Sequence, residues 1–256
     1  MTGYARFHDL DGASVFITGG GAGIGAALTE GFLAQGAQVA FVQRTDATAF
    51  CDGLAARHGR RPLYLCCDVR DVAALQNAME EAARVHGPIT VLVNNAADDS
   101  RHSLAGTSVE DWDRIQAVNL RPHFFTAQAA APGMAAAGGG SIVNFSSISY
   151  LMGHHEMPGY VAAKAAITGL THALARELGP QRIRVNALLP GWVLTDRQKQ
   201  LWATPEGLAG HLARQCIPEH LVESDIVDAA LFLASKASRM MTGQALVVDG
   251  GVVVTG

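Results

Sequence analysis

Tyr160 and Lys164 stand four residues apart in an alanine-rich segment of the chain. Side chains at i and i+4 lie on one face of an α-helix, so a helix here would hold a phenol beside an ammonium group. A neighbouring positive charge favours the phenolate and lowers the pKa of tyrosine from about 10, which suits acid/base work near neutral pH. The pair therefore predicts proton transfer, although a tyrosine and a lysine one turn apart also occur on ordinary exposed helices.

A cluster of glycines follows an apolar run at residues 14–18 and opens an alanine-rich stretch. Glycines let the backbone turn sharply and approach a pyrophosphate, whose charge is met by the free N–H groups and the dipole of a helix N-terminus. Between a predicted strand and a predicted helix, the cluster indicates a dinucleotide site more strongly than a bare glycine motif would. The residues expected to line it are Gly19, Gly21, Gly23, Ile24 and Gly25.

Strand-like apolar runs alternate along the chain with alanine-rich stretches of helical length. This alternation is typical of a doubly wound α/β fold, in which a parallel sheet is covered on both faces. The runs have almost no polar alternation, as expected of strands buried on both sides. We expect strands at 14–18, 38–42, 62–66, 90–94, 141–146, 184–189 and 245–249, and helices at 24–35, 72–86, 108–131, 160–177 and 223–234.

The composition favours one domain spanning residues 1–256. Apolar residues make up 49% of the chain and charged residues 16%, and no stretch rich in Pro, Ser and Gly offers a linker. The net charge of −4 and the three scattered lysines exclude a basic surface for nucleic acid. No apolar segment has the length of a signal peptide or a membrane span, so we expect a soluble, cytoplasmic protein without membrane contact.

The cysteines and histidines predict no metal site. Cys51, Cys66, Cys67 and Cys216 have neither CxxC spacing nor a histidine cluster at ligand distance. We therefore expect reduced, mostly buried thiols.

The end of the second predicted strand bears on the choice of dinucleotide. An acidic residue there suits a free ribose 2′-hydroxyl, and a basic residue suits a 2′-phosphate. In this chain Val42 is followed by Gln43 and Arg44, whose planar guanidinium can grip a phosphate. The pattern favours NADP. Arg44 as a solvated surface charge is the alternative, and Asp46 keeps NAD open.

Several motifs together resemble the short-chain dehydrogenase/reductase family. After the glycine pattern come Asn94-Asn95-Ala96, Asn119, Ser147, the Tyr160/Lys164 pair and Pro190-Gly191, in the order and spacing of that family. The resemblance runs from about residue 10 to residue 251. It implies a single Rossmann-type domain that uses NAD or NADP, is usually a homotetramer or homodimer, and needs no metal for its chemistry.

The resemblance also implies roles for individual residues. Tyr160 would be the general acid/base, and Lys164 would lower its pKa and hold the nicotinamide ribose. Ser147, thirteen residues before Tyr160, would hydrogen-bond the reacting oxygen, and Asn119 would hold a water in a proton relay. The spacing selects Ser147 over the adjacent Ser146. Further cofactor contacts would come from Asp68 and Val69 at the adenine, from Asn94 and Ala96, and from Pro190, Gly191, Val193 and Thr195 at the nicotinamide end.

Two positions depart from the family pattern. Ala97 replaces the glycine that often follows Asn-Asn-Ala, which should affect only local packing, and Gln43 replaces the common acid, which weakens the case for NAD.

Finer motifs, among them the segments 94–102 and 190–198, resemble bacterial aldose 1-dehydrogenases of this family. The resemblance implies oxidation of a pentose, hexose or deoxyhexose at C1 to the lactone, with Tyr160 as the base. A sugar needs several hydrogen-bonding partners, although each candidate singly could be a solvated loop residue. The expected substrate contacts are Asp98, Ser147, Ser149, His154, Tyr160, Trp192, Arg197 and Gln198.

Two other functions stay open. The protein could act on another secondary alcohol, a ketone or an acyl thioester, for which a more apolar segment than His154-His155-Glu156 would be expected. It could also be a nucleotide sensor without catalysis, although such a protein has no need of a base.

Overall fold

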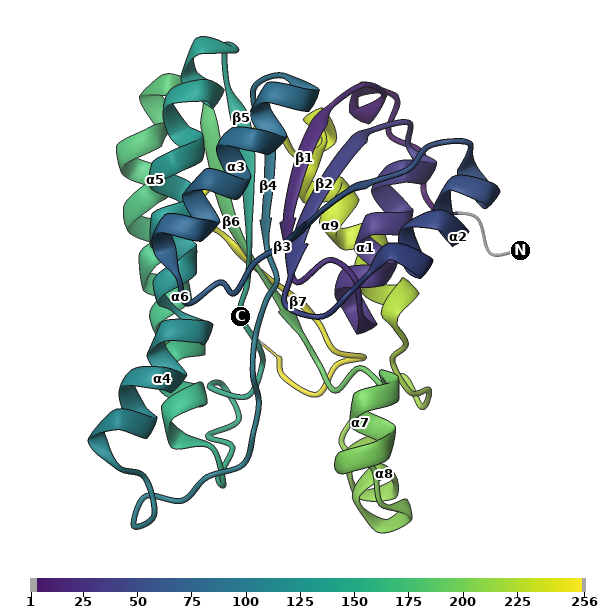
Figure 1. Ribbon diagram of the computed structural model, residues 1–256. Helices are drawn as coiled ribbons and strands as arrows, with labels where there is room; N and C mark the ends of the chain where they lie inside the picture. The colour runs from purple at the N-terminus through teal and green to yellow at the C-terminus, as the bar shows by residue number, and fades with distance from the viewer. Residues whose placement is uncertain (1–3, 255–256) are drawn as a thin grey trace.

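All the predicted strands lie in one parallel sheet in the computed structural model, which describes residues 4–254 (Figure 1). The strand order is β3-β2-β1-β4-β5-β6-β7, so the chain winds outward in one direction from β1 and in the other from β4. A parallel sheet of this kind leaves a crevice at the carboxyl ends of the strands where the winding reverses. The strands are β1 (Ser14–Thr18), β2 (Gln38–Gln43), β3 (Leu63–Cys66), β4 (Val91–Asn94), β5 (Gly140–Phe145), β6 (Ile183–Pro190) and β7 (Ala245–Val248).

Helices cover both faces of the sheet (Figure 1). Neighbouring strand residues point to opposite faces: Ile17 packs with α1, α2 and α9, whereas Phe16 packs with α3, α5 and α6. This two-sided burial explains why the strands are apolar throughout. The helices are α1 (Gly23–Ala34), α2 (Thr48–His58), α3 (Val72–His86), α4 (Val109–Asn119), α5 (Arg121–Ala136), α6 (Pro158–Leu178), α7 (Asp196–Leu201), α8 (Pro205–Leu212) and α9 (Glu223–Ala234), with short 3₁₀ turns η1 (His8–Leu10), η2 (Gly179–Gln181) and η3 (Lys236–Ser238).

The helix predicted over 108–131 is in fact two helices, because the chain breaks at Leu120. Leu120 has φ −125° and ψ −54°, outside the helical region, and Pro122 lies in the first turn of α5. Proline lacks the N–H needed to continue the α4 hydrogen-bond ladder and its ring crowds the carbonyl four residues earlier. The break places Asn119 at the end of α4 instead of inside a helix.

Three helices were not predicted from the sequence. The helix α2 buries few residues. The helices α7 and α8 follow β6 and precede α9 in the chain, and they lie outside the layers that cover the sheet. Threonines cap both short helices: Thr195 Oγ1 accepts from the Gln198 N–H at 3.3 Å, and Thr204 Oγ1 accepts from the Gly207 N–H at 3.1 Å. Figure 1 shows α7 and α8 projecting below the sheet, beyond the carboxyl ends of the strands.

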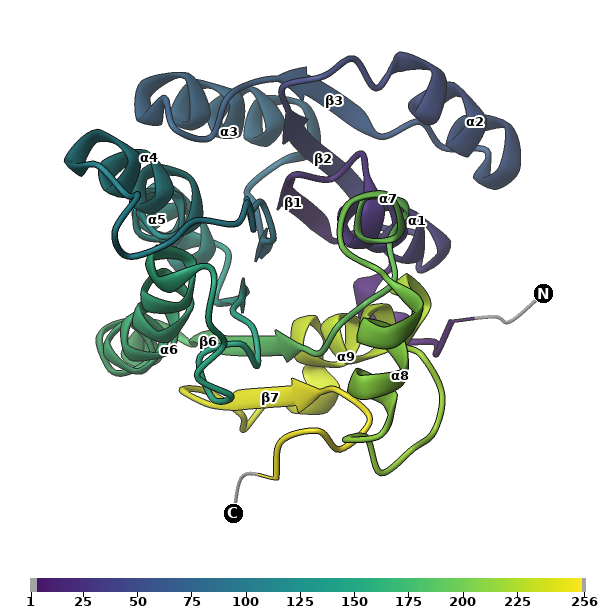
Figure 2. The ribbon, with the colours of Figure 1, turned by 90° about the horizontal axis from the view of Figure 1, so that it is seen from below.

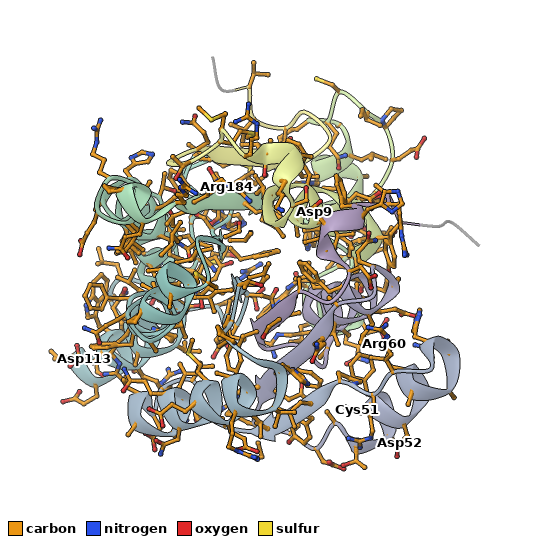
Figure 3. The ribbon with its side chains drawn as sticks, turned by 90° about the horizontal axis from the view of Figure 1, so that it is seen from above. Asp9, Cys51, Asp52, Arg60, Asp113 and Arg184 are labelled. Atoms are coloured by element: carbon orange, nitrogen blue, oxygen red, sulfur yellow. The ribbon has the colours of Figure 1, made fainter. Side chains whose placement is uncertain are left out.

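At the other end of the sheet, Arg184 of β6 holds the end of α9. Its guanidinium donates to the carbonyls of Leu233, Ala234 and Ser235 at 2.8–3.1 Å and to Ser238 Oγ at 2.8 Å. Figure 3 looks from above, the side opposite α7 and α8, and labels Arg184 and Asp9. Asp9 belongs to the same end of the molecule, where its carboxylate accepts from the Lys236 N–H at 2.7 Å.

Within residues 4–254, no helix is long and apolar enough to cross a membrane, and no three His, Cys, Asp or Glu side chains gather as a metal site. Cys51 and Cys67 are buried, whereas Cys66 and Cys216 are exposed, so the expectation of mostly buried thiols holds for only half of them.

Candidate active site

The glycine cluster forms the turn between β1 and α1. Gly19 has φ +70°, a conformation that side chains disfavour, and a Cβ on Gly25 would collide with the carbonyl oxygen of Gly19. The residue before α1 is Ala22, whose side chain caps none of the first N–H groups of the helix. These N–H groups are therefore available to a phosphate, so the loop fits the pyrophosphate of a dinucleotide.

The side chains near the ends of β2 and β3 differ in their availability to a ligand. Gln43 folds back, with its Nε2 donating to the Thr45 carbonyl at 2.9 Å. Asp46 is engaged at the start of α2, where it accepts from the N–H and the hydroxyl of Thr48 at 3.1 and 2.6 Å. Arg44 remains 69% exposed, with its guanidinium 4.0 Å from Asp68.

Asp68, expected at the adenine, carries a charge-assisted pair of hydrogen bonds. The Arg70 guanidinium donates to both carboxylate oxygens at 2.6–3.0 Å, and this holds the pKa of Asp68 below its usual range. Arg44 and Arg70 therefore flank one carboxylate at this edge of the site.

Tyr160 and Lys164 lie on one face of α6, as their spacing predicted. The Lys164 Nζ is 5.4 Å from the centre of the Tyr160 ring and donates to the Phe145 carbonyl at 2.7 Å. Lys164 is only 1% exposed. The helix carries these two residues in its first turns, directly beside the carboxyl end of β5.

The protonation of the pair differs from the expectation. Burial lowers the pKa of Lys164 to about 7, against a smaller opposing effect of Asp99. Burial also raises the pKa of Tyr160, and the charge of Asp99 raises it further, whereas a hydrogen bond with Ser147 lowers it. The predicted lowering of the Tyr160 pKa by Lys164 is therefore not found: burial has the largest effect on the phenol, and the cation that lowers its pKa is Arg101.

The two adjacent serines have different environments. Ser146 is buried and donates from its Oγ to the Lys164 carbonyl at 2.6 Å. The Ser147 Oγ accepts from the Ser149 N–H at 3.1 Å, and its hydroxyl is close enough to Tyr160 for hydrogen bonding to lower the pKa of the phenol. The structure thus brings Ser147 to the tyrosine and leaves Ser146 as a link between β5 and α6.

Asn119 is fully buried, and its side-chain amide is engaged in holding the loop that follows β4. Its Oδ1 accepts from the Asp98 N–H at 2.9 Å, and its Nδ2 donates to the carbonyls of Asp98 and Ile115 at 3.1 and 3.0 Å. Asn94 is similarly engaged, donating to Asn144 Oδ1 at 3.0 Å and accepting from Thr126 at 2.7 Å.

A pocket of about 420 Å³ lies at the carboxyl ends of the strands. Figure 2 looks onto this end and shows α7 and α8 on the side of the molecule opposite α4 and α6. The predicted site residues that line the pocket are Ile24, Ser147, Ser149, His154, Tyr160, Lys164, Pro190, Gly191, Trp192, Val193, Thr195 and Gln198. The predicted residues outside its lining are Gly19, Gly21, Gly23, Gly25, Gln43, Arg44, Asp68, Val69, Asn94, Ala96, Asp98, Asn119 and Arg197.

Known proteins share this architecture and much of the sequence. Residues 19–253 match a family model described as enoyl-(acyl carrier protein) reductase. The chain is 50% identical to a probable galactose dehydrogenase of Rhizobium meliloti, over 97% of this chain and 98% of that protein. It is 43% identical to D-xylose 1-dehydrogenase of Caulobacter vibrioides, over 96% and 98%. The structure of a putative short-chain alcohol dehydrogenase from Sinorhizobium meliloti superposes with a TM-score of 0.91 at 35% identity, covering 96% of this chain and 98% of that one.

The chain belongs to the short-chain dehydrogenase/reductase family. It is an NAD(P)-dependent dehydrogenase. The glycine turn before α1 and the Ser147/Tyr160/Lys164 group at the carboxyl ends of the strands lie where a dinucleotide and its reaction partner meet in such a fold.

Several lining residues of this short-chain dehydrogenase were not predicted from its sequence. Asp99, instead of the expected Asp98, faces the pocket and accepts from Gln198 Nε2 at 2.6 Å. The guanidinium of Arg101 lies 4.6 Å above the ring of Trp202. The unpredicted residues that carry a polar group are Asn95, Asp99, Arg101, Ser146, His155, Glu156, Trp202, His211 and Arg214.

The reason for these omissions is the tertiary structure. In a loop, Asp98 and Asp99 are equivalent by sequence pattern. In the structure Asn119 binds the backbone N–H and carbonyl of Asp98, and Gln198 binds the carboxylate of Asp99 beside the pocket. Trp202 and His211 belong to the α7–α8 segment (residues 196–212), which the periodicity did not reveal.

Proposed function

We propose that this dehydrogenase oxidises an aldose, a pentose, hexose or deoxyhexose, at C1 to the lactone, with Tyr160 as the general base. The observation that carries the proposal is the pocket itself, which joins the Ser147/Tyr160 pair to a wall of hydrogen-bonding side chains. A sugar needs such a wall, and an aliphatic chain does not. The names of two relatives, a probable galactose dehydrogenase and a D-xylose 1-dehydrogenase, support the same substrate class.

In the proposed reaction, Tyr160 as phenolate takes the proton of the C1 hydroxyl while Ser147 holds the same oxygen by a hydrogen bond. The bound dinucleotide supplies a hydride acceptor at nicotinamide C4. The C1–H bond breaks with its electron pair as the C1–O double bond of the lactone forms, and the proton remains on Tyr160. Lys164 is expected to hold the nicotinamide ribose. Asn119 is expected to hold a water that later carries this proton from Tyr160 to solvent, and the water would bind its backbone carbonyl, because the side-chain amide is engaged with Asp98 and Ile115.

The raised pKa of Tyr160 has a consequence for this mechanism. A phenol that is mostly protonated at neutral pH is a weak base there, so oxidation should accelerate as the pH rises. The Ser147 hydrogen bond opposes the effect of burial and favours the phenolate. Ser147 therefore serves both the substrate oxygen and the base.

We further propose that NADP is the preferred dinucleotide. Arg44 offers a largely exposed guanidinium at the end of β2, Gln43 brings no charge, and the Asp46 carboxylate is engaged with Thr48 at the start of α2. A free 2′-hydroxyl would lack an acidic partner at this edge, whereas a 2′-phosphate would find Arg44.

The enzyme is also proposed to work in the cytoplasm as a homotetramer or homodimer. Val109 of α4 and Phe124 of α5 are exposed apolar side chains on neighbouring helices, as a subunit contact requires.

Two alternatives are disfavoured by particular residues. An acyl thioester or simple ketone would leave Trp202 Nε1 and His211 Nε2 without partners in the pocket wall. A nucleotide sensor would have no use for the Ser147 hydrogen bond to Tyr160.

The test is a panel of aldoses, secondary alcohols and ketones assayed with NAD and NADP at the absorbance band of the reduced nicotinamide. We expect turnover of an aldose and release of its lactone, and loss of turnover in Tyr160→Phe with cofactor affinity nearly intact. Oxidation of simple alcohols but of no aldose would refute the substrate class. Tight dinucleotide binding without turnover of any compound would favour the sensor.

A further inference from the structure

Three buried polar atoms in the pocket wall have no hydrogen-bond partner among residues 4–254. They are Ser149 Oγ, Trp202 Nε1 and His211 Nε2, and all three residues line the pocket that contains Tyr160. Buried polar groups in native proteins are almost always satisfied, so an unpartnered group in a residue that lines a pocket indicates a partner among the molecules that the pocket binds. One of them, Ser149, lies just after β5, and the other two belong to the α7–α8 segment.

The surroundings of His211 define which of its nitrogens carries the proton. Its Nδ1 lies 3.4 Å from Arg214 Nη2, and arginine can only donate, so Nδ1 is the acceptor. Burial lowers the pKa of His211 and keeps the ring neutral. A neutral ring with an accepting Nδ1 has its hydrogen on Nε2, and this N–H is therefore a donor without an acceptor. The Trp192 ring, at 5.4 Å and 86°, fixes the imidazole from its edge.

Trp202 presents a second donor of the same kind. An indole Nε1 can only donate, so its missing partner must be an acceptor atom. The Arg101 guanidinium lies 4.6 Å over the ring and holds the indole in place. The α7–α8 segment thus contributes two unpartnered N–H donors to the wall of the pocket.

Asp99 brings the opposite hydrogen-bonding character to the same pocket. Its Oδ2 accepts from Gln198 at 2.6 Å, and its Oδ1 has only long contacts of 3.4–3.5 Å with Arg197. The carboxylate is near enough to Tyr160 to raise the pKa of the phenol. A substrate hydroxyl could therefore donate to Asp99 while other oxygens of the same molecule accept from Trp202 and His211. Only a molecule with several hydroxyls meets both demands.

We propose that His211 and Trp202 are specificity-determining residues, which donate hydrogen bonds to sugar hydroxyl oxygens remote from C1 and thereby set which aldoses the enzyme accepts. Ser149 adds a hydroxyl that can donate or accept. This inference rests on the proposed function and deepens it. The C1 chemistry belongs to Tyr160 and Ser147, and the choice of sugar belongs largely to the α7–α8 segment.

The experiment measures kcat and KM of the full-length enzyme for galactose and for its 3-deoxy, 4-deoxy and 6-deoxy analogues. Trp202→Phe removes the Nε1–H but keeps an aromatic ring below Arg101, and His211→Phe removes both ring nitrogens at similar volume. Each variant should lower kcat/KM for galactose about tenfold or more, mainly through KM, because one hydrogen bond to the substrate is lost. Each should also lose discrimination against one particular deoxy analogue, namely the one that lacks the oxygen bound by the missing donor.

Trp112→Phe and His172→Phe are the matched controls, since both side chains are exposed on α4 and α6, outside the pocket lining. They should change neither kinetic constant. All variants should still bind NADP, which would show that the fold is intact. Calorimetry measures this binding for every variant, and quenching of tryptophan fluorescence measures it for the histidine variants.

Two failures are distinguishable. If the wild-type enzyme oxidises no aldose, the proposed function fails, and this inference fails with it. If it oxidises aldoses, two results would overturn only this inference: the two variants lose the same factor in kcat/KM with galactose and with every deoxy analogue, or their kcat/KM does not change. The donors would then serve packing or bind a water.

Discussion

Gln198 Nε2 lies 2.6 Å from Asp99 Oδ2, although 99 residues separate the two in the chain. The bond ties the start of α7 to the loop after β4, and it passes directly beside the pocket that both residues line. The start of α7 also lies close to the phosphate loop. A Cβ added to Gly23 would lie 3.2 Å from Cγ2 of Thr195, the residue that caps α7. Asp99 therefore both binds the α7–α8 segment and raises the pKa of Tyr160.

Replacing Asp99 by Asn should shift the pH dependence of oxidation. The Asp99 charge raises the pKa of Tyr160, so its removal lowers that pKa, and the phenolate then forms at lower pH. We expect the rise of kcat with pH to move to lower pH by up to about one unit, with a higher KM for the sugar. Asp98→Asn should shift the profile less, because Asp98 has the smaller effect on Tyr160. Identical profiles for all three proteins would exclude the electrostatic role.

The adjacent serines offer a matched pair for the second prediction. Ser147→Ala should lower kcat by about 10²–10³-fold, because the substrate oxygen and the phenolate both lose a hydrogen bond. Ser146→Ala removes only the bond to the Lys164 carbonyl and should leave kcat within about threefold while lowering the melting temperature. Steady-state kinetics and thermal unfolding of both variants check this, and equal losses of kcat would contradict the assignment.

Arg44→Gln should weaken NADP selectively. The loss of a charge-assisted bond to the 2′-phosphate is expected to raise the KM for NADP about tenfold or more, with little change for NAD. Arg84→Gln is the control, since Arg84 is an exposed side chain paired with Glu81 on α3. Cofactor kinetics at saturating sugar are the measurement, and an equal change for both dinucleotides would argue against recognition of the 2′-phosphate.

Arg184→Gln should destabilise the protein without changing its chemistry. The guanidinium satisfies three carbonyls and a hydroxyl at the end of α9, and their loss should cost about 2–4 kcal/mol of unfolding free energy. Arg184 lies at the end of the sheet opposite α7 and α8, so kcat/KM at temperatures where the variant is folded should stay unchanged (Figure 3). Chemical denaturation beside Arg176→Gln, an exposed control on α6, tests this expectation.

The sequence by itself determined the seven strands, the helices α1, α3, α6 and α9, the phosphate loop and the Tyr160/Lys164 pair, whereas Ser147 came from the resemblance to the family. These features depend on local patterns: apolar runs, glycines between a strand and a helix, and one turn of helical spacing. The spacing of Tyr160 and Lys164 sufficed to place them side by side on α6, because an α-helix has a fixed period.

Only the tertiary structure decided the pKa of Tyr160 and the wall of the pocket. Desolvation depends on everything packed around a group, so the raised pKa of Tyr160 could not be read from its lysine neighbour. The choice of Asp99 over Asp98, and the arrival of Trp202 and His211 at the same pocket, follow from contacts between segments about a hundred residues apart. Such contacts are set by packing and leave no periodic trace in the chain.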